Sequence, residues 1–216
     1  MVAAERPELS ACEVLARFAE EYDLARIVWR SGPDELVVVE RRPVRVLLSG
    51  VAVPFPPGAF LQASPSAEMI LVEEVLSAVG PARPAVDLFA GLGAFAFALA
   101  CDGPVHAVEG DVGTAAALAH AAADQPRLTV ERRDLARNPL PLRGCGLDPP
   151  RAGAARQAEA LAASAVATVI AISCNPASFA RDAASLVSGG YRLERVTPVD
   201  QFVWTPHLEL AATFRR

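Results

Sequence analysis

The sequence predicts an α/β fold in which a doubly wound, Rossmann-like sheet of seven mostly parallel strands follows a small N-terminal α+β segment. From Ser64 onward, short β-rich runs alternate with alanine-rich helical runs, which is typical of a sheet covered by helices on both faces. A glycine-rich turn joins the first strand of this part to the next helix. Hydrophobic residues make up 52% of the 216 residues, enough for one full domain and a smaller appendage.

The α+β segment is predicted at residues 1–60. Residues 7–22 carry apolar side chains at helical spacing, and β-rich runs separated by turn residues follow at 25–29, 35–40, 44–48 and 51–53. The proline-rich stretch at 54–58 is typical of a linker. We therefore expect a second domain at 61–216.

The second domain is predicted to start with a helix, because Ser64 is a good N-cap, Pro65 fits a first helical turn, and Gly80 ends the apolar pattern. Strands and helices then alternate. The expected strands are 85–89, 105–109, 128–132, 146–148, 168–173, 192–198 and 208–214, and the expected helices between them are 94–101, 112–123, 154–165 and 176–187. Ligands of such sheets bind at the carboxyl ends of the strands.

The charge, the cysteine spacing and the apolar runs of the sequence indicate which classes of protein function to expect. The net charge of −5 argues against sequence-independent attraction to a polyanion, although a local basic cluster can still act. All 20 basic residues are arginine, which suits phosphate contacts but equally reflects a genomic bias. No C-x-x-C pair suggests a metal site, and we expect none. The sequence has neither a long apolar run nor an apolar signal core at its start, so we expect a cytoplasmic protein without a membrane segment.

The run DLFAGLGAFAF (87–97) is typical of a nucleotide-binding turn. Gly91 and Gly93 allow a tight turn and a close approach of a ligand to the backbone. Glu109 ends the next strand, where a carboxylate accepts hydrogen bonds from both ribose hydroxyls of an adenosine. The same spacing fits a dinucleotide site, so an NAD-dependent dehydrogenase stays an alternative at this point.

Four further runs occur in a fixed order: GAFLQAS (58–64), LDPPRAGA (147–154), ISCNPASFARD (172–182) and PHLE (206–209). Together with the glycine turn, they closely resemble the RNA 5-methyluridine methyltransferases, which act on transfer and ribosomal RNA with S-adenosylmethionine. The resemblance covers roughly residues 25–216. It implies an RNA (uracil-5-)-methyltransferase with a methyltransferase sheet, preceded at 1–60 by part of the family's central domain, and rRNA or tRNA as its partner.

The chemistry of this family explains the residue types. Carbon 5 of uracil is a poor nucleophile, and a thiolate that adds to carbon 6 makes it electron-rich. After methylation, a base must remove the carbon-5 proton before the thiolate leaves. The resemblance places the nucleophile at Cys174 and the base at Glu209. It also implies cofactor contacts at Gln62, Phe89, Gly91, Gly93, Glu109, Asp134 and Asp148.

The sequence departs from the family between Asp134 and Asp148, where the chain is short and residues 144–146 make a poor strand because glycine weakens sheet interiors. Family members also carry more chain before the matched part. A catalytically degenerate S-adenosylmethionine-binding module is therefore an alternative. The dehydrogenase alternative leaves the DPPR and SCNP runs unexplained.

Several polar residues outside these motifs have open roles. Arg151 and Arg181 could contact RNA phosphates, although Arg181 could simply pair with Asp182. His207 is expected to support its neighbours rather than to catalyse. Cysteines that match no catalytic motif are expected to be packing residues, namely Cys12, Cys101 and Cys145.

Overall fold

Local capping sets the start and end of the helix that opens the larger part of the chain. The computed structural model describes residues 6–32, 34–80, 84–141, 146–147, 153–202, 204–205 and 207–216. In it, the Ser64 hydroxyl accepts the backbone N–H of Ala67 at 3.1 Å, and α2 (Pro65–Val79) begins with a proline in its first turn. Gly80 ends the helix with a left-handed φ of 73°. This helix agrees with the prediction at both ends.

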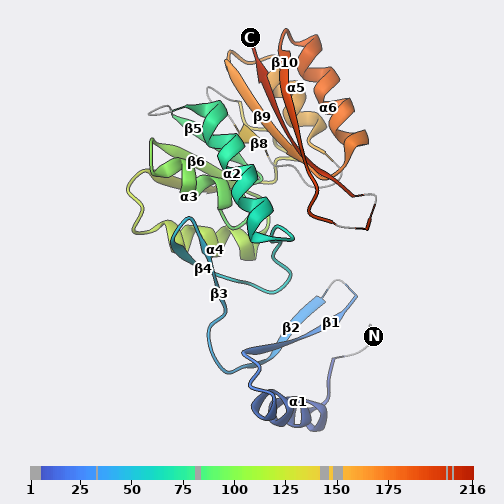
Figure 1. Ribbon diagram of the computed structural model, residues 1–216. Helices are drawn as coiled ribbons and strands as arrows, with labels where there is room; N and C mark the ends of the chain where they lie inside the picture. The colour runs from blue at the N-terminus through green and yellow to red at the C-terminus, as the bar shows by residue number, and fades with distance from the viewer. Residues whose placement is uncertain are drawn as a thin grey trace.

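A seven-stranded sheet runs through the described part of the larger unit (Figure 1). Its order is β10-β11-β9-β8-β5-β6-β7, and β11 runs antiparallel to β9 and β10 while β9, β8, β5, β6 and β7 are parallel. The strands are β5 (Ala85–Leu88), β6 (Val105–Glu109), β7 (Leu128–Arg132), β8 (Gly146–Leu147), β9 (Thr168–Ser173), β10 (Arg192–Val199) and β11 (Glu209–Arg215). The order reverses at β5, which is where sheets of this type hold their ligands.

Helices cover both faces of this sheet, as a doubly wound fold requires (Figure 1). Ile170 and Ile172 of β9 join one buried cluster with side chains of α2, α3 and α4, whereas Val169 joins a second cluster with side chains of α5 and α6. The alternation follows from the two-residue period of a strand. The helices are α3 (Ala94–Ala100), α4 (Val112–Ala122), α5 (Ala155–Ala162) and α6 (Pro176–Ser188).

The N-terminal part contains one helix and two hairpins. The helix α1 (Leu9–Glu21) contacts the antiparallel pair β1 (Arg26–Ser31) and β2 (Asp34–Glu40), and these elements project away from the sheet (Figure 1). The second hairpin, β3 (Arg45–Leu48) and β4 (Val51–Pro54), instead buries Leu48 and Val53 in the cluster shared with α2, α3 and α4. The hairpin thus packs in the core of the larger unit, and a domain boundary at residue 60 stays a prediction.

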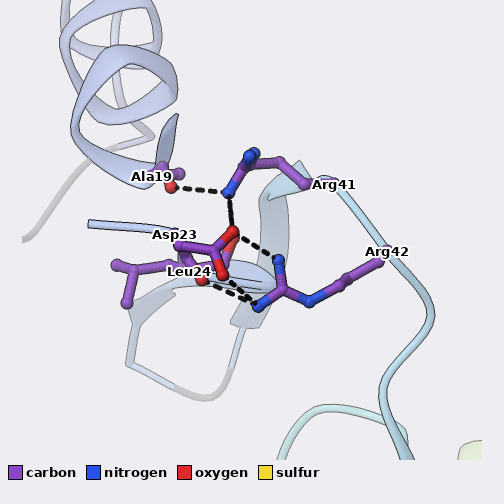
Figure 2. Close-up of polar contacts among 5 residues, drawn as sticks. All are labelled: Ala19, Asp23, Leu24, Arg41 and Arg42. Atoms are coloured by element: carbon purple, nitrogen blue, oxygen red, sulfur yellow. Dashed lines mark hydrogen bonds and ion pairs between the residues drawn. The ribbon is translucent and has the colours of Figure 1, made fainter. Parts of the chain in front are cut away.

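Two arginines that follow β2, Arg41 and Arg42, bind the end of α1 and the turn after it (Figure 2). Arg41 donates to the carbonyl oxygen of Ala19 at 3.0 Å and to Asp23 at 2.9 Å, and Arg42 donates to the Asp23 carboxylate at 2.8 Å. Hydrogen bonds from Arg42 and then Arg41 lower the pKa of Asp23. These two arginines therefore stabilise the C-terminal end of a helix. The arginine content of the sequence did not distinguish this structural role from phosphate binding.

Some sequence-based expectations need correction or lie outside the described residues. Cys101 is exposed at the end of α3, so its interpretation as a packing residue is wrong; the helix ends there and turns the side chain to solvent. Cys12 is half-buried, and Cys145 lies outside the described residues. In the described ranges, no helix has the length and apolarity of a membrane span, and no group of His, Cys, Asp and Glu is arranged to hold a metal ion.

Candidate cofactor and catalytic site

The turn after β5 has a backbone that favours glycine. Phe89, Gly91 and Gly93 have left-handed φ values of 60°, 55° and 96°. A Cβ added to Gly93 would lie 2.6 Å from Leu118 and 2.8 Å from the Phe97 ring, so the start of α3 fits closely against its neighbours. A Cβ added to Gly91 would meet no atom within 4 Å, which leaves open space beside the backbone.

Glu109 is fixed next to this turn by two backbone N–H groups. Its Oε2 accepts from Gly91 at 2.8 Å, and its Oε1 accepts from Asp111 at 2.7 Å. Each carboxylate oxygen can accept a second hydrogen bond. The structure thus brings together Gly91, Gly93 and Glu109, as the sequence predicts, and presents an oriented carboxylate at the carboxyl end of β6.

The other residues predicted on the cofactor side are more dispersed. Phe89 is half-buried and packs against the cluster beneath α5 and α6. Asp134 follows β7 and touches the segment after Glu109, because a Cβ on Gly110 would lie 3.5 Å from the Asp134 Cα. The exposed Asp134 carboxylate accepts the Ala136 N–H at 3.1 Å, so it also stabilises its own turn. Asp148 lies outside the described residues.

Asp87 is a buried carboxylate that the sequence analysis did not single out. It is 2% exposed, and its Oδ2 has no hydrogen-bond partner among the described residues. Burial raises the pKa of Asp87 to about 7; the hydrogen bond from the Ala96 N–H opposes this change, and the charge of Glu109 adds to it. A titratable group with a perturbed pKa beside a ligand-binding turn is a candidate functional residue. The signal was an aspartate inside the apolar strand AVDL.

The predicted nucleophile and base are brought together by the pairing of β9 with β11. Leu210 is opposite Ser173, so Cys174 and Glu209 are each the next residue along the chain from a paired residue. Cys174 is half-buried, whereas Glu209 is 3% exposed. The thiol therefore lies at the carboxyl edge of the sheet rather than within the apolar core.

A network of local hydrogen bonds holds the turn that contains Cys174. The Asn175 N–H donates to the Ser173 hydroxyl at 3.3 Å, and the Asn175 side chain caps α6 by accepting the Ala177 N–H at 3.0 Å. Ser178 donates to the Asn175 carbonyl oxygen at 3.1 Å. Cys174 is therefore held just before a helix N-terminus, where the helix dipole favours negative charge.

Gln62 is hydrogen-bonded to Gln201, a residue that the sequence did not indicate. The Gln201 amide nitrogen donates to Gln62 Oε1 at 2.7 Å, and its oxygen accepts the Ala63 N–H at 3.0 Å. Burial raises the pKa of Glu209, and a hydrogen bond from Gln201 opposes that change. No sequence motif marks Gln201, because its partners are separated from it by up to 139 residues.

Among the remaining residues considered for the site, Arg181 forms an ion pair, whereas His207 and Trp204 are exposed to solvent. Arg181 forms an ion pair with Asp182 at 2.8 Å, which is the second of the two roles considered for it. His207 is exposed, and its ring lies edge-on to Phe202 with the centroids 6.1 Å apart. Arg151 lies outside the described residues. Trp204, in the same loop as Gln201, is 99% exposed with a left-handed φ of 68°.

Sequence comparison connects this arrangement to known proteins. Residues 128–216 match the family model described as tRNA (Uracil-5-)-methyltransferase. An uncharacterized RNA methyltransferase of Mesorhizobium japonicum is 44% identical over 205 residues, covering 91% of this chain and 50% of that protein. The 23S rRNA (uracil(1939)-C(5))-methyltransferase of Chromohalobacter salexigens is 35% identical over 210 residues, covering 89% and 44%. The chain spans about half the length of the curated relatives it matches.

Structural comparison agrees on the fold. The tRNA (uracil-54, C5)-methyltransferase of Pyrococcus abyssi, solved with S-adenosyl-L-homocysteine, superimposes with a TM-score of 0.75 at 24% identity, covering 99% of this chain and 54% of that one. TYW2 of M. jannaschii, solved with AdoMet, gives a TM-score of 0.66 at 13% identity, covering 89% and 94%. These likenesses confirm the predicted methyltransferase type of α/β fold.

Asp87→Asn should make the protein's stability less dependent on pH. A carboxyl whose pKa is raised from 3.8 to about 7 on folding stabilises the native state while protonated and loses this contribution as pH rises through about 7. Urea denaturation at pH 5 to 8 should show the wild type falling relative to the variant by roughly 2–3 kcal/mol in total. The exposed Asp102→Asn is the control, and parallel curves for wild type and Asp87→Asn would contradict the assignment.

Gly93→Ala should destabilise the protein more than Gly50→Ala. Both glycines have left-handed φ values, but a Cβ at Gly50 meets nothing within 4 Å whereas one at Gly93 meets Leu118 and Phe97. We expect a loss of about 1 kcal/mol for Gly50→Ala and roughly 2–4 kcal/mol for Gly93→Ala, measured by urea denaturation. Equal losses would show that close packing at the turn is unimportant.

Proposed function

Because the chain belongs to the family of RNA uracil-5 methyltransferases, we propose that it transfers a methyl group from S-adenosylmethionine to carbon 5 of a uridine in RNA. The observation that supports this proposal is the pairing of Ser173 with Leu210, because these residues adjoin Cys174 and Glu209. That pair lies at the same edge of the sheet as the glycine turn and Glu109, since β5, β6 and β9 are parallel. Nucleophile, base and cofactor site thus face one region.

The described residues fit an adenosine cofactor. Open space beside Gly91 allows a ligand to approach the backbone, and the Glu109 carboxylate is oriented to accept from the ribose hydroxyls. The free oxygen of Asp87 lies in the strand that leads into this turn. When bound, S-adenosylmethionine supplies an electrophilic methyl group. The complexes of the Pyrococcus and M. jannaschii proteins support this choice of cofactor over NAD.

Cys174 opens the proposed reaction. Its sulfur forms a bond to carbon 6 of the uracil ring, and the electron pair of the C5–C6 double bond moves into an enolate. The bound cofactor would then supply its methyl group to carbon 5; its methyl–sulfur bond would break, and S-adenosylhomocysteine would leave. The position of Cys174 before α6 favours the thiolate, which is the reactive form. The hydrogen bonds between Ser173 and Asn175 keep this turn in place during addition.

Glu209 closes the proposed reaction. Its carboxylate takes the proton from carbon 5, the C5–C6 double bond re-forms, and the bond from carbon 6 to sulfur breaks. Burial raises the pKa of Glu209, which makes its ionised form a stronger base than an exposed glutamate. The carboxylate must be ionised to act, so the rate of this step should increase with pH through that raised pKa.

We favour ribosomal RNA as the substrate, because the relative from Chromohalobacter that acts on 23S rRNA is 35% identical and the tRNA enzyme from Pyrococcus is 24% identical.

A second candidate function is cofactor binding without turnover. The short stretch of sequence between Asp134 and Asp148 supports it, because the glycines at 144 and 146 weaken a strand that leads to Asp148. A measurement of methyl transfer to RNA distinguishes the two candidate functions: the methyltransferase gives methylated RNA, and the binding module does not.

RNA containing 5-fluorouridine should form a covalent complex with the wild-type chain in the presence of S-adenosylmethionine. Fluorine replaces the proton that the base removes, so the bond between Cys174 and carbon 6 persists. Cys174→Ala should abolish the complex on a denaturing gel, whereas Cys101→Ala should retain it. A complex of undiminished yield with Cys174→Ala would refute the nucleophile, and its absence from the wild type across ribosomal and transfer RNAs would refute the activity.

Glu209→Gln should trap the chain on ordinary RNA. The variant can still add its thiol and transfer methyl, but it lacks the base that releases the product, so turnover should fall by roughly 100-fold or more. We expect a denaturation-resistant RNA complex that carries the radiolabelled methyl group. The exposed Glu159→Gln should behave as wild type. Full turnover by Glu209→Gln would assign proton removal to another group.

A further inference from the structure

Asp182 joins the middle of α6 to the start of α5 through both of its carboxylate oxygens. Its Oδ2 accepts the backbone N–H of Ala154, the residue before α5, at 2.6 Å. Its Oδ1 accepts from the Arg181 guanidinium, at 2.9 Å from Nε and 2.8 Å from Nη2. The start of α5 has no side-chain cap at Ala154, so this contact from α6 anchors it.

Gly153 brings the chain close against the same part of α6. It has a left-handed φ of 80°. A Cβ added to it would lie 2.6 Å from the Asp182 carboxylate and 3.0 Å from the Ser178 Cβ, and it would also collide with the Arg181 guanidinium. Residues 178, 181 and 182 lie on one face of the helix because they are three and four positions apart. The Gly153 backbone is therefore held directly against that face.

These contacts lie next to the turn that contains Cys174. Ser178, which faces Gly153, is buried and donates to the Asn175 carbonyl oxygen at 3.1 Å. Asn175 and the Ser173 side chain exchange two hydrogen bonds, each of 3.3 Å, across Cys174. The backbone at Gly153 therefore packs against the side chain that holds the two residues on either side of the thiol.

The packing of α6 on the sheet is incomplete near this turn. A cavity of about 20 Å³ lies between α5, α6, β9 and β11, and Ala154, Ser173 and Asp182 are among the residues that line it. Atoms that border a void lose dispersion contacts on that side. The polar contacts of Asp182 therefore contribute more to the position of α6 here than they would in a fully packed core.

We propose that Asp182 is a positioning residue that holds the Cys174 turn against the start of α5 and so keeps the thiol aligned for addition to carbon 6 of the uracil. The proposal rests on the proposed function. Asp182 acts on the addition step, through Gly153 and Ser178. It takes no part in cofactor binding, which depends on the turn after β5 and on Glu109.

Asp182→Ala and Asp182→Asn test this assignment. Asparagine keeps an oxygen that can accept the Ala154 N–H, but it cannot form an ion pair with Arg181, so its effect should be the smaller of the two. Formation of the covalent complex with RNA containing 5-fluorouridine should slow by about tenfold to a hundredfold in Asp182→Ala, and by less in Asp182→Asn. The dissociation constant for S-adenosylmethionine, measured by calorimetry, should stay at the wild-type value in both variants.

Alkylation of Cys174 by iodoacetamide gives a readout that needs neither RNA nor cofactor. Mass spectrometry of digested protein separates the Cys174 peptide from the peptides of the other three cysteines. Asp182→Ala should react several-fold more slowly than the wild type at neutral pH, because a displaced turn loses its alignment with the helix N-terminus that favours the reactive thiolate. Circular dichroism checks the fold, and Asp182→Asn takes over the test if Asp182→Ala does not fold.

Glu74→Gln is the matched control, because Glu74 pairs with Arg195 at 2.7 Å, links α2 to β10, and is 17% exposed compared with 13% for Asp182. It should lower the melting temperature about as much as Asp182→Asn and leave both rates of Cys174 unchanged. Complex formation or alkylation at or above the wild-type rate in Asp182→Ala overturns the assignment of Asp182 and leaves the methyl transfer proposal intact. A wild type that forms no complex with any ribosomal or transfer RNA overturns the proposed function, and with it the role of Asp182 in addition.

Discussion

The pairing of β11 with β9 is the constraint on which the candidate catalytic centre depends. Glu209 is 35 residues from Cys174 in the sequence (209 − 174), and the antiparallel register brings their neighbours Leu210 and Ser173 opposite each other. That register is set by apolar packing farther along the strand. Phe214 is fully buried in the cluster beneath α5 and α6, while Ala211 lies in the cluster beneath α2, α3 and α4. A slip of one residue would exchange these faces, so packing of the core fixes the chemistry at its edge.

The candidate cofactor site, at Gly91, Gly93 and Glu109, depends on the backbone conformation of the single turn after β5. Left-handed conformations at Phe89, Gly91 and Gly93 are costly for most residues and tend to occur together at functional sites. Here they direct the Gly91 N–H toward Glu109, which is thereby oriented before any ligand arrives. Binding then needs little rearrangement of the carboxylate, which reduces the entropic cost of ordering it.

The sequence contained most of the fold because its local signals agree with one another. The limits of β6, β7 and β9 match the prediction, since turn residues bound each apolar run, and the caps at Ser64 and Asn175 start their helices as side-chain chemistry requires. The resemblance supplied the pair at Cys174 and Glu209. Gln201 could not be found in this way, because its hydrogen bond to Gln62 spans 139 residues and follows no pattern. Asp87 was missed although it stands in the apolar strand AVDL, because the residue type alone does not show that its carboxyl group is buried.

The place of β8 in the sheet has a mechanical consequence. This strand joins the part that carries the glycine turn and Glu109 to the part that carries Cys174 and Glu209, through Asp87–Gly146 and Leu88–Leu147 on one side and Leu147–Ala171 on the other. The helix α2 contacts α3 in the first part and β9 and β11 in the second, so it packs across both. A change in the packing of α2 would therefore alter the distance between the glycine turn and Cys174.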